Sequence, residues 1–70
     1  MPIVLAPIDE ELTVFRIGTD EKTRKHLQSL GLVLNSKIRL IACSHGNVII
    51  EVKGIRLAMN KDVATKIFVA

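Results

Sequence analysis

Apolar side chains recur at every second position in two runs of the last third of the chain, and Gly54 separates the runs. The two runs are Val48, Ile50 and Val52, followed by Ile55, Leu57 and Met59. Successive side chains of a strand point to opposite faces, so this period of two predicts a β-hairpin. Asn60 is a good helix cap, and the short string at 61–66 predicts one helical turn. Residues 67–69 then end the chain as a further strand.

The middle of the chain predicts one helix between two strands. Residues 12–17 carry apolar side chains on both faces, which indicates a first strand that is covered twice or curls around a barrel. A helix should follow at about 20–30, where Thr19 or Asp20 caps the first turn and Gly31 permits a Schellman ending. Residues 37–43 alternate again as a strand, and 45–47 form a tight turn. The fold predicted is mainly β: a small SH3-like β-barrel of five strands, with the helix between strands 1 and 2 and the helical turn before the last strand.

Length and composition restrict the class of protein. Seventy residues allow one domain, residues 1–70, and only Phe15 and Phe68 are aromatic. A single cysteine excludes an internal disulfide framework. The apolar start, residues 1–8, lacks a basic leader, is interrupted by two prolines, and is far shorter than the roughly 20 apolar residues that span a bilayer. We therefore expect a cytoplasmic protein.

The net charge of +3 is distributed unevenly along the chain. Residues 1–21 hold five acids and one base, whereas residues 22–70 hold nine bases and two acids. A basic surface can face nucleic acid, lipid headgroups or an acidic protein. No run of Lys and Arg exceeds two residues, however, and the chain offers no aromatic platform for stacking bases. We interpret the charge as an ordinary solvated surface and expect no nucleic acid.

Cys43 and His45 are the strongest candidates for metal ligands, because thiolates and imidazoles bind soft and borderline metals. A structural site commonly has four ligands in paired motifs, and these two residues stand alone at a strand end. We interpret them as a buried or half-buried cysteine and a turn histidine, and we expect no metal and no cofactor.

Catalytic chemistry has less support still. The four glycines are spread over element boundaries, which is typical of turns and not of a phosphate-binding loop. No serine, histidine and aspartate are placed to suggest a triad. The acidic run at 9–11 is interpreted as solvated, and a barrel of this size should have no room for a deep pocket. We expect the protein not to be an enzyme.

The order and spacing of these elements resemble the FeoA family, small cytoplasmic accessory proteins of bacterial ferrous iron uptake. The resemblance covers about residues 12–69, although a turn at 35–36 stands where the family often has Pro-Gly. The matching residues are Leu27, Leu30, Gly31 and Leu32 at the helix ending, Ile38, Leu40 and Ala42 in the second strand, and Gly54, Arg56, Leu57, Ala58, Met59, Ala64, Ile67 and Val69 in the last third.

The resemblance implies a module that binds the cytoplasmic side of FeoB, a membrane iron transporter with a G-protein domain, and that touches the membrane only through this partner. The candidate docking residues are Arg24, Lys25 and Leu27 on the helix, with Arg56 on the hairpin. Leu27 has a second interpretation as core packing, which is the role that we assign to Leu30 and Leu32.

Two alternatives stay open beside this hypothesis. Barrels of the same family type occur as C-terminal domains of metal-dependent repressors, so the chain could be a regulatory or nucleic-acid-binding module. In addition, exposed strand edges in so short a barrel would allow a weak homodimer.

Overall fold

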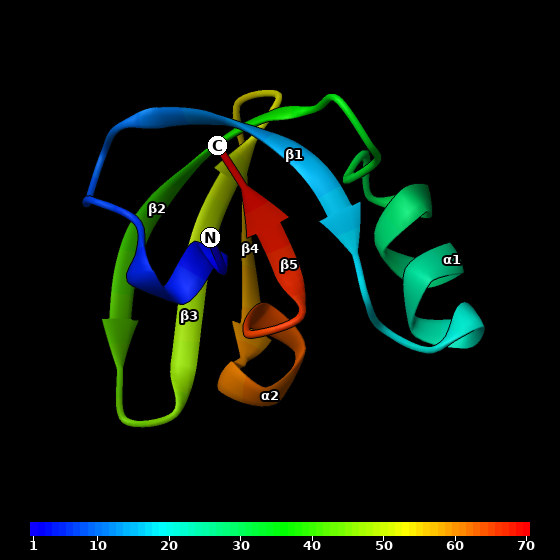
Figure 1. Cartoon of the computed structure of the whole chain (residues 1–70). Helices are drawn as coiled ribbons and strands as arrows, with labels where there is room; N and C mark the ends of the chain where they lie inside the picture. Colours follow the sequence, from blue (N-terminus) through cyan, green and yellow to red (C-terminus); the bar gives the residue numbers. More distant parts are fainter.

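Five antiparallel strands and two α-helices make up the structure, a computed structural model that describes residues 1–70 (Figure 1). The strands are β1 (Glu11–Ile17), β2 (Lys37–Ser44), β3 (Asn47–Val52), β4 (Ile55–Asn60) and β5 (Ile67–Val69). Helix α1 (Glu21–Ser29) lies between β1 and β2, helix α2 (Lys61–Ala64) precedes β5, and a 3-10 helix, η1 (Ile3–Leu5), begins the chain. The mainly-β fold that the sequence predicts is therefore confirmed, including the positions of both helices.

The strands form one sheet in the order β4-β3-β2-β1-β5. Strand β1 connects its two halves, because residues 11–13 pair with β2 and residues 14–17 pair with β5. A register shift between Val14 and Arg16 leaves Phe15 without a partner at this change of neighbours. Figure 1 shows the consequence: β1 arches across the molecule and β5 lies in front of β4. The two ends of the sheet, β4 and β5, are joined by α2 and not by a strand ladder, so the barrel is not closed.

Both hairpin turns contain two residues with positive φ. His45 and Gly46 have φ of 51° and 80°, and Lys53 and Gly54 have φ of 53° and 77°. Positive φ at both central positions is the type I′ geometry, whose twist matches that of the flanking strands. The turn expected at 45–47 is thus confined to two residues, and Asn47 already belongs to β3.

Thirteen hydrophobic residues form a single core. They are Ile3, Ala6, Val14, Leu27, Leu32, Ile38, Leu40, Val48, Ile50, Val52, Ala64, Ile67 and Val69. The three members from β3 are almost completely buried, which confirms the period of two that predicted this strand. All thirteen are aliphatic, so the core is held by close packing of aliphatic side chains without aromatic rings.

The N-terminal segment is part of this core, although its sequence pattern predicted no element there. Ile3 is fully buried, and the backbone of Met1 exchanges hydrogen bonds of 2.9 and 2.7 Å with Val69. Further along, the Asp9 amide donates to the Leu40 carbonyl at 2.7 Å. Met1 and Pro2 thus lie along the outer edge of β5, whereas Ile8 and Asp9 lie beside Leu40 of β2.

Candidate functional site

Helix α1 begins and ends with local signals that the sequence contains. The Asp20 carboxylate accepts a hydrogen bond of 3.1 Å from the Thr23 amide. Hydrogen bonding with the side chain and the backbone of Thr23 holds the pKa of Asp20 below its usual value. At the other end Gly31 has φ of 97°, and the Leu32 amide donates to the Leu27 carbonyl at 3.0 Å. This six-to-one bond is the Schellman ending that the sequence predicted.

The contact between α1 and the sheet is narrow. Leu27 is the only buried residue of the helix, and the chain reversal at Gly31 then brings Leu32 into the core. Leu30 is 39% exposed, so the prediction that it packs in the core is wrong. The reason is geometric: Leu30 is the helix cap at the point where the chain turns, and Leu32 occupies the core position instead.

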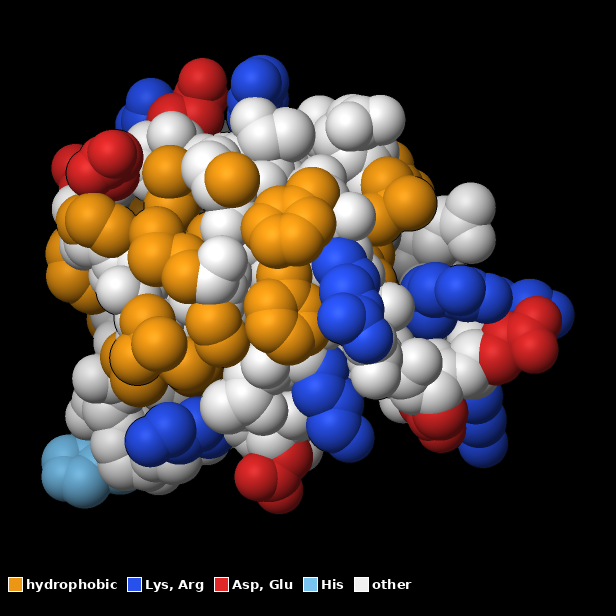
Figure 2. All heavy atoms as spheres, in the orientation of Figure 1, with side chains coloured by type: hydrophobic (Ala, Val, Ile, Leu, Met, Phe, Trp, Pro, Cys, Tyr) orange, Lys and Arg blue, Asp and Glu red, His pale blue; other side chains and the backbone are white.

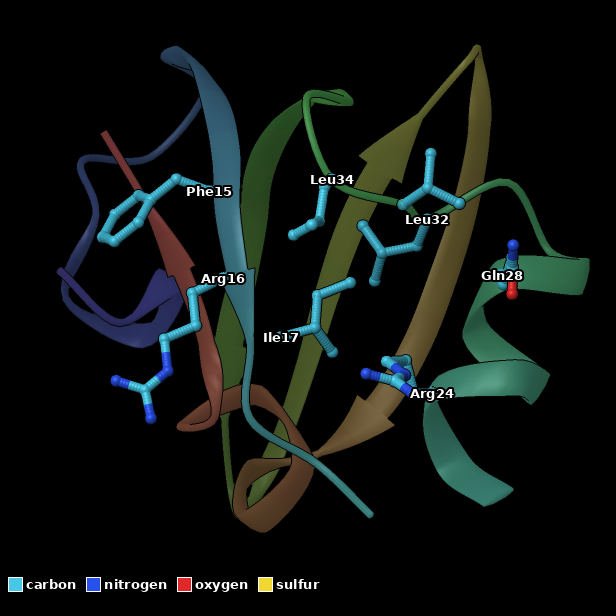
Figure 3. Close-up of a pocket in the computed structure, with 8 residues that line it drawn as sticks. Phe15, Arg16, Ile17, Arg24, Gln28, Leu32 and Leu34 are labelled. Carbon is cyan, nitrogen blue, oxygen red and sulfur yellow. The ribbon is translucent and has the colours of Figure 1, made fainter. Parts of the chain in front are cut away.

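A groove of about 550 Å³ opens between α1 and β1 (Figure 3). Three elements line it: Phe15, Arg16 and Ile17 from β1, Arg24 and Gln28 from α1, and Leu32, Val33 and Leu34 from the link to β2. This groove is open to solvent and lies outside the barrel, so it is not the deep pocket that a barrel of this size was expected to lack. The barrel interior is filled by side chains. Leu27 is the only buried residue of α1, so the rest of the helix does not pack on the sheet and a gap remains beside β1.

Two of the apolar side chains at the groove are more than half exposed. Phe15 is 54% exposed, because the register shift in β1 leaves it outside the ladder. Leu34 is 56% exposed and precedes Asn35, whose φ of 72° turns the chain sharply toward β2. The sequence contained a signal for Phe15, since apolar residues on both faces of a strand require a cover on each side. Leu34 gave no such signal, because its place depends on how the link folds over the sheet.

Two arginines flank this apolar floor. The Arg16 guanidinium lies 5.3 Å from the centre of the Phe68 ring, and the Phe15 and Phe68 ring centres are 6.3 Å apart. Exposed cation–π contacts of this kind contribute about 0.5–1 kcal/mol, enough to bias the orientation of a side chain. Arg24 has no carboxylate within 4.0 Å, and Figure 3 shows its side chain extending from α1 toward Ile17. Figure 2 shows that Lys and Arg side chains border the apolar area on the side of α1.

The structure does not bring the four expected docking residues together. Arg24 lines the groove, whereas Lys25 is exposed and pairs with Glu21 at 3.6 Å. Leu27 is 4% exposed, so its packing alternative holds and its side chain cannot meet a partner directly. Arg56 lies on β4 beside Glu51, at 3.9 Å between charged atoms, and takes no part in the groove.

Cys43 and His45 lie at the end of the β2–β3 hairpin, and both are exposed. The buried or half-buried environment expected for the cysteine is therefore wrong. The nearest polar contact is local, with 2.9 Å between Ser44 Oγ and His45 Nδ1. No group of three or more His, Cys, Asp or Glu side chains converges anywhere in the chain. None of its helices is long and apolar enough to span a bilayer.

The rolled five-stranded sheet, with one helix inserted after its first strand, defines an SH3-like domain. The protein-family model described as "FeoA domain" matches residues 1–70, the whole chain. The chain is also 34% identical over 68 residues to the Methanocaldococcus jannaschii protein described as "Putative Fe(2+) transport protein A", a match that covers 97% of this chain and 83% of that protein. The chain belongs to the FeoA family.

Two solved structures show how far the fold extends. An iron uptake regulatory protein (FeoA) superposes with a TM-score of 0.85 at 27% identity, over 99% of this chain and 93% of that one. A manganese-dependent transcriptional repressor superposes with a TM-score of 0.88 at 21% identity, over 99% of this chain but only 40% of the repressor. The second likeness is one of fold alone, found in part of a longer chain.

Proposed function

We propose that this chain is a non-enzymatic accessory protein of ferrous iron uptake, which acts in the cytoplasm by docking on the membrane transporter FeoB. Membership of the FeoA family over the whole chain supports this proposal, as does the iron-transport name of its archaeal relative. Docking would modulate transport or nucleotide turnover by contact, and the ferrous ion would remain the cargo of the transporter.

The groove between α1 and β1 is the surface that we assign to docking, and it is the observation that carries the proposal. Protein interfaces are enriched in aromatic residues and arginine, and the groove offers Phe15, Arg16 and Arg24 around an apolar floor. A complementary segment would place an aliphatic side chain on Ile17 and Leu34 and a carboxylate near Arg24. The apolar contact would supply most of the affinity, because exposed ion pairs contribute only about 0–1 kcal/mol. The arginines would instead favour one orientation and speed association.

A pair of matched substitutions tests this assignment. Leu34→Asp places a charge on the groove floor, and Ile8→Asp makes the same change at a position of nearly equal exposure, 56% against 57%, outside the groove. Both side chains are largely in solvent, so both variants should fold. We expect Leu34→Asp to lose co-purification with FeoB from solubilised membranes and Ile8→Asp to retain it. Retention by both variants, or equal loss by both, would show that the groove is not the docking surface.

A regulatory module is the second candidate, and the likeness to the manganese-dependent repressor favours it. This candidate differs from the first in its salt response. Binding to DNA or RNA would weaken steeply as salt rises, because each neutralised phosphate releases counterions. The groove contact should change little, since its apolar part is not screened.

A further inference from the structure

One edge of the sheet is paired with the N-terminal residues, and the other edge is open. The outer edge of β5 is covered, since the Met1 backbone pairs with Val69 and Pro2 bridges to Phe68. The outer edge of β4 has no such cover: β4 ends the strand order, and only β3 and α2 pack extensively against it. An open edge exposes backbone donors and acceptors that can pair with another strand.

The register of β4 shows which backbone groups are open. Val52 and Ile55 flank the two-residue turn at 53–54, so they form a hydrogen-bonded pair, and the pairs alternate from there. The bond of 2.9 Å from the Lys61 amide to the Gly46 carbonyl continues the same alternation. It follows that the amides and carbonyls of Arg56 and Ala58 point away from β3, and no backbone hydrogen bond outside the β3–β4 ladder uses them.

The side chains of β4 are incompletely covered on their core face, although Leu57 and Met59 pack against the core. Ile55, Leu57 and Met59 share the face of the buried β3 residues, yet Ile55 is 57% exposed and the other two are only half-buried. They lie beside the core without a strand to cover them. Strand β4 has no proline and no register shift that would discourage pairing.

We propose that β4 pairs antiparallel with β4 of a second copy, about a two-fold axis between the two Leu57 residues. In this register Arg56 of each copy lies opposite Ala58 of the other, and the open amides and carbonyls of both residues are used. Leu57 lies opposite Leu57, and Ile55 lies opposite Met59, so the apolar face becomes continuous across the two sheets. The surface is separate from the groove, so this inference does not rest on docking to FeoB.

Charge and chain path select this register among its neighbours. An axis through Arg56 would place two guanidinium groups directly opposite each other, which is unfavourable across a strand pair. An axis through Ala58 would set Ile55 opposite Lys61, where the chain has left the strand and entered α2. Only the axis at Leu57 places apolar side chains opposite apolar ones and keeps Arg56 away from its own copy.

Two substitutions at one position test both the dimer and its register. Ala58 is exposed, so Ala58→Glu and Ala58→Arg should both fold. The proposed register sets the new charge opposite Arg56, twice in each dimer. We expect Ala58→Glu to tighten the dimer by about 2- to 30-fold and Ala58→Arg to weaken it by a similar factor, given the usual size of cross-strand charge pairs. Both differences should shrink at high salt.

Sedimentation equilibrium at low salt, from micromolar to about millimolar protein, measures these constants. Ser29→Glu and Ser29→Arg make the same charge changes at an exposed position on α1 and should leave self-association unchanged. A chain that remains monomeric throughout this range overturns the proposal. So does weakening by both Ala58 variants, because an axis through Ala58 would set like charges opposite each other in either case.

Discussion

Leu27 is the single buried contact between α1 and the sheet, so its truncation should reveal how the wall of the groove is held. Burying a leucine side chain contributes about 1.5–3 kcal/mol, and Leu→Ala in a core costs about 2–5 kcal/mol once the cavity is included. A helix of nine residues is marginal by itself in water. We therefore expect Leu27→Ala to release α1 while the sheet stays folded.

Native-state hydrogen exchange followed by NMR measures this release. A loss of about 2 kcal/mol corresponds to about a 30-fold fall in the protection of α1 amides, whereas β3 amides should remain close to their original protection. Leu30→Ala is the matched control, because Leu30 is 39% exposed and its truncation should change stability by no more than about 0.5 kcal/mol.

Two outcomes would refute this reasoning. Unchanged α1 protection in Leu27→Ala would show that other contacts hold the helix. Equal loss in α1 and β3 would show that helix and sheet unfold as one unit. If α1 is released as expected, docking should weaken as well, because Arg24 and Gln28 line the groove from this helix.

Two further predictions concern the ends of the chain and of the helix. Ile3→Ala should lower the free energy of unfolding by about 2–4 kcal/mol, because Ile3 is fully buried. Leu5→Ala is the control, since Leu5 is 70% exposed and its truncation should change this free energy by no more than about 0.5 kcal/mol. Urea unfolding followed by circular dichroism measures both values, and equal effects would show that the N-terminal segment is not packed. Because the contacts with Thr23 lower the pKa of Asp20, the stabilisation from this cap is complete at neutral pH and is lost as the pH falls through that lowered pKa. Asp20→Asn keeps a side-chain oxygen that can accept the Thr23 hydrogen bond but does not titrate. The measurement is the hydrogen-exchange rate of the Thr23 amide, divided by its intrinsic rate at each pH. This ratio should rise on acidification in the original chain and stay constant in the variant.

Local signals account for the parts of the fold that the sequence predicts well. The hairpin around Gly54 needs only a period of two and a turn with positive φ, and both are readable within a dozen residues. The Schellman ending at Gly31 is equally local, as is the last strand at 67–69. The hairpin and the helix ending have hydrogen-bond partners close along the chain, whereas the apolar run at 67–69 indicates a strand without indicating its distant partner β1.

The sequence pattern does not predict the features that depend on contacts between residues far apart in the chain. Met1 meets Val69 across nearly the whole length of the chain, and no periodicity in residues 1–8 indicates such a contact. Whether Leu30 or Leu32 enters the core depends on where the sheet lies after the chain turns. The groove follows from the same placement, so its residues could not be assembled from sequence spacing alone.

The change of partners within β1 explains why so small a sheet leaves two surfaces available. Because β1 leaves β2 after Thr13 and continues along β5, the sheet rolls without closing, and Phe15 is left outside the ladder beside the gap under α1. The N-terminal residues cover the edge of β5, whereas β4 ends the strand order with its outer edge unpaired. A closed barrel of the same five strands would have neither an open edge nor a strand end facing a groove. Incomplete closure thus leaves two separate accessible surfaces, to which we assign the proposed docking and the proposed self-association. A variant at Leu34 should affect only the first of these activities, and a variant at Ala58 only the second.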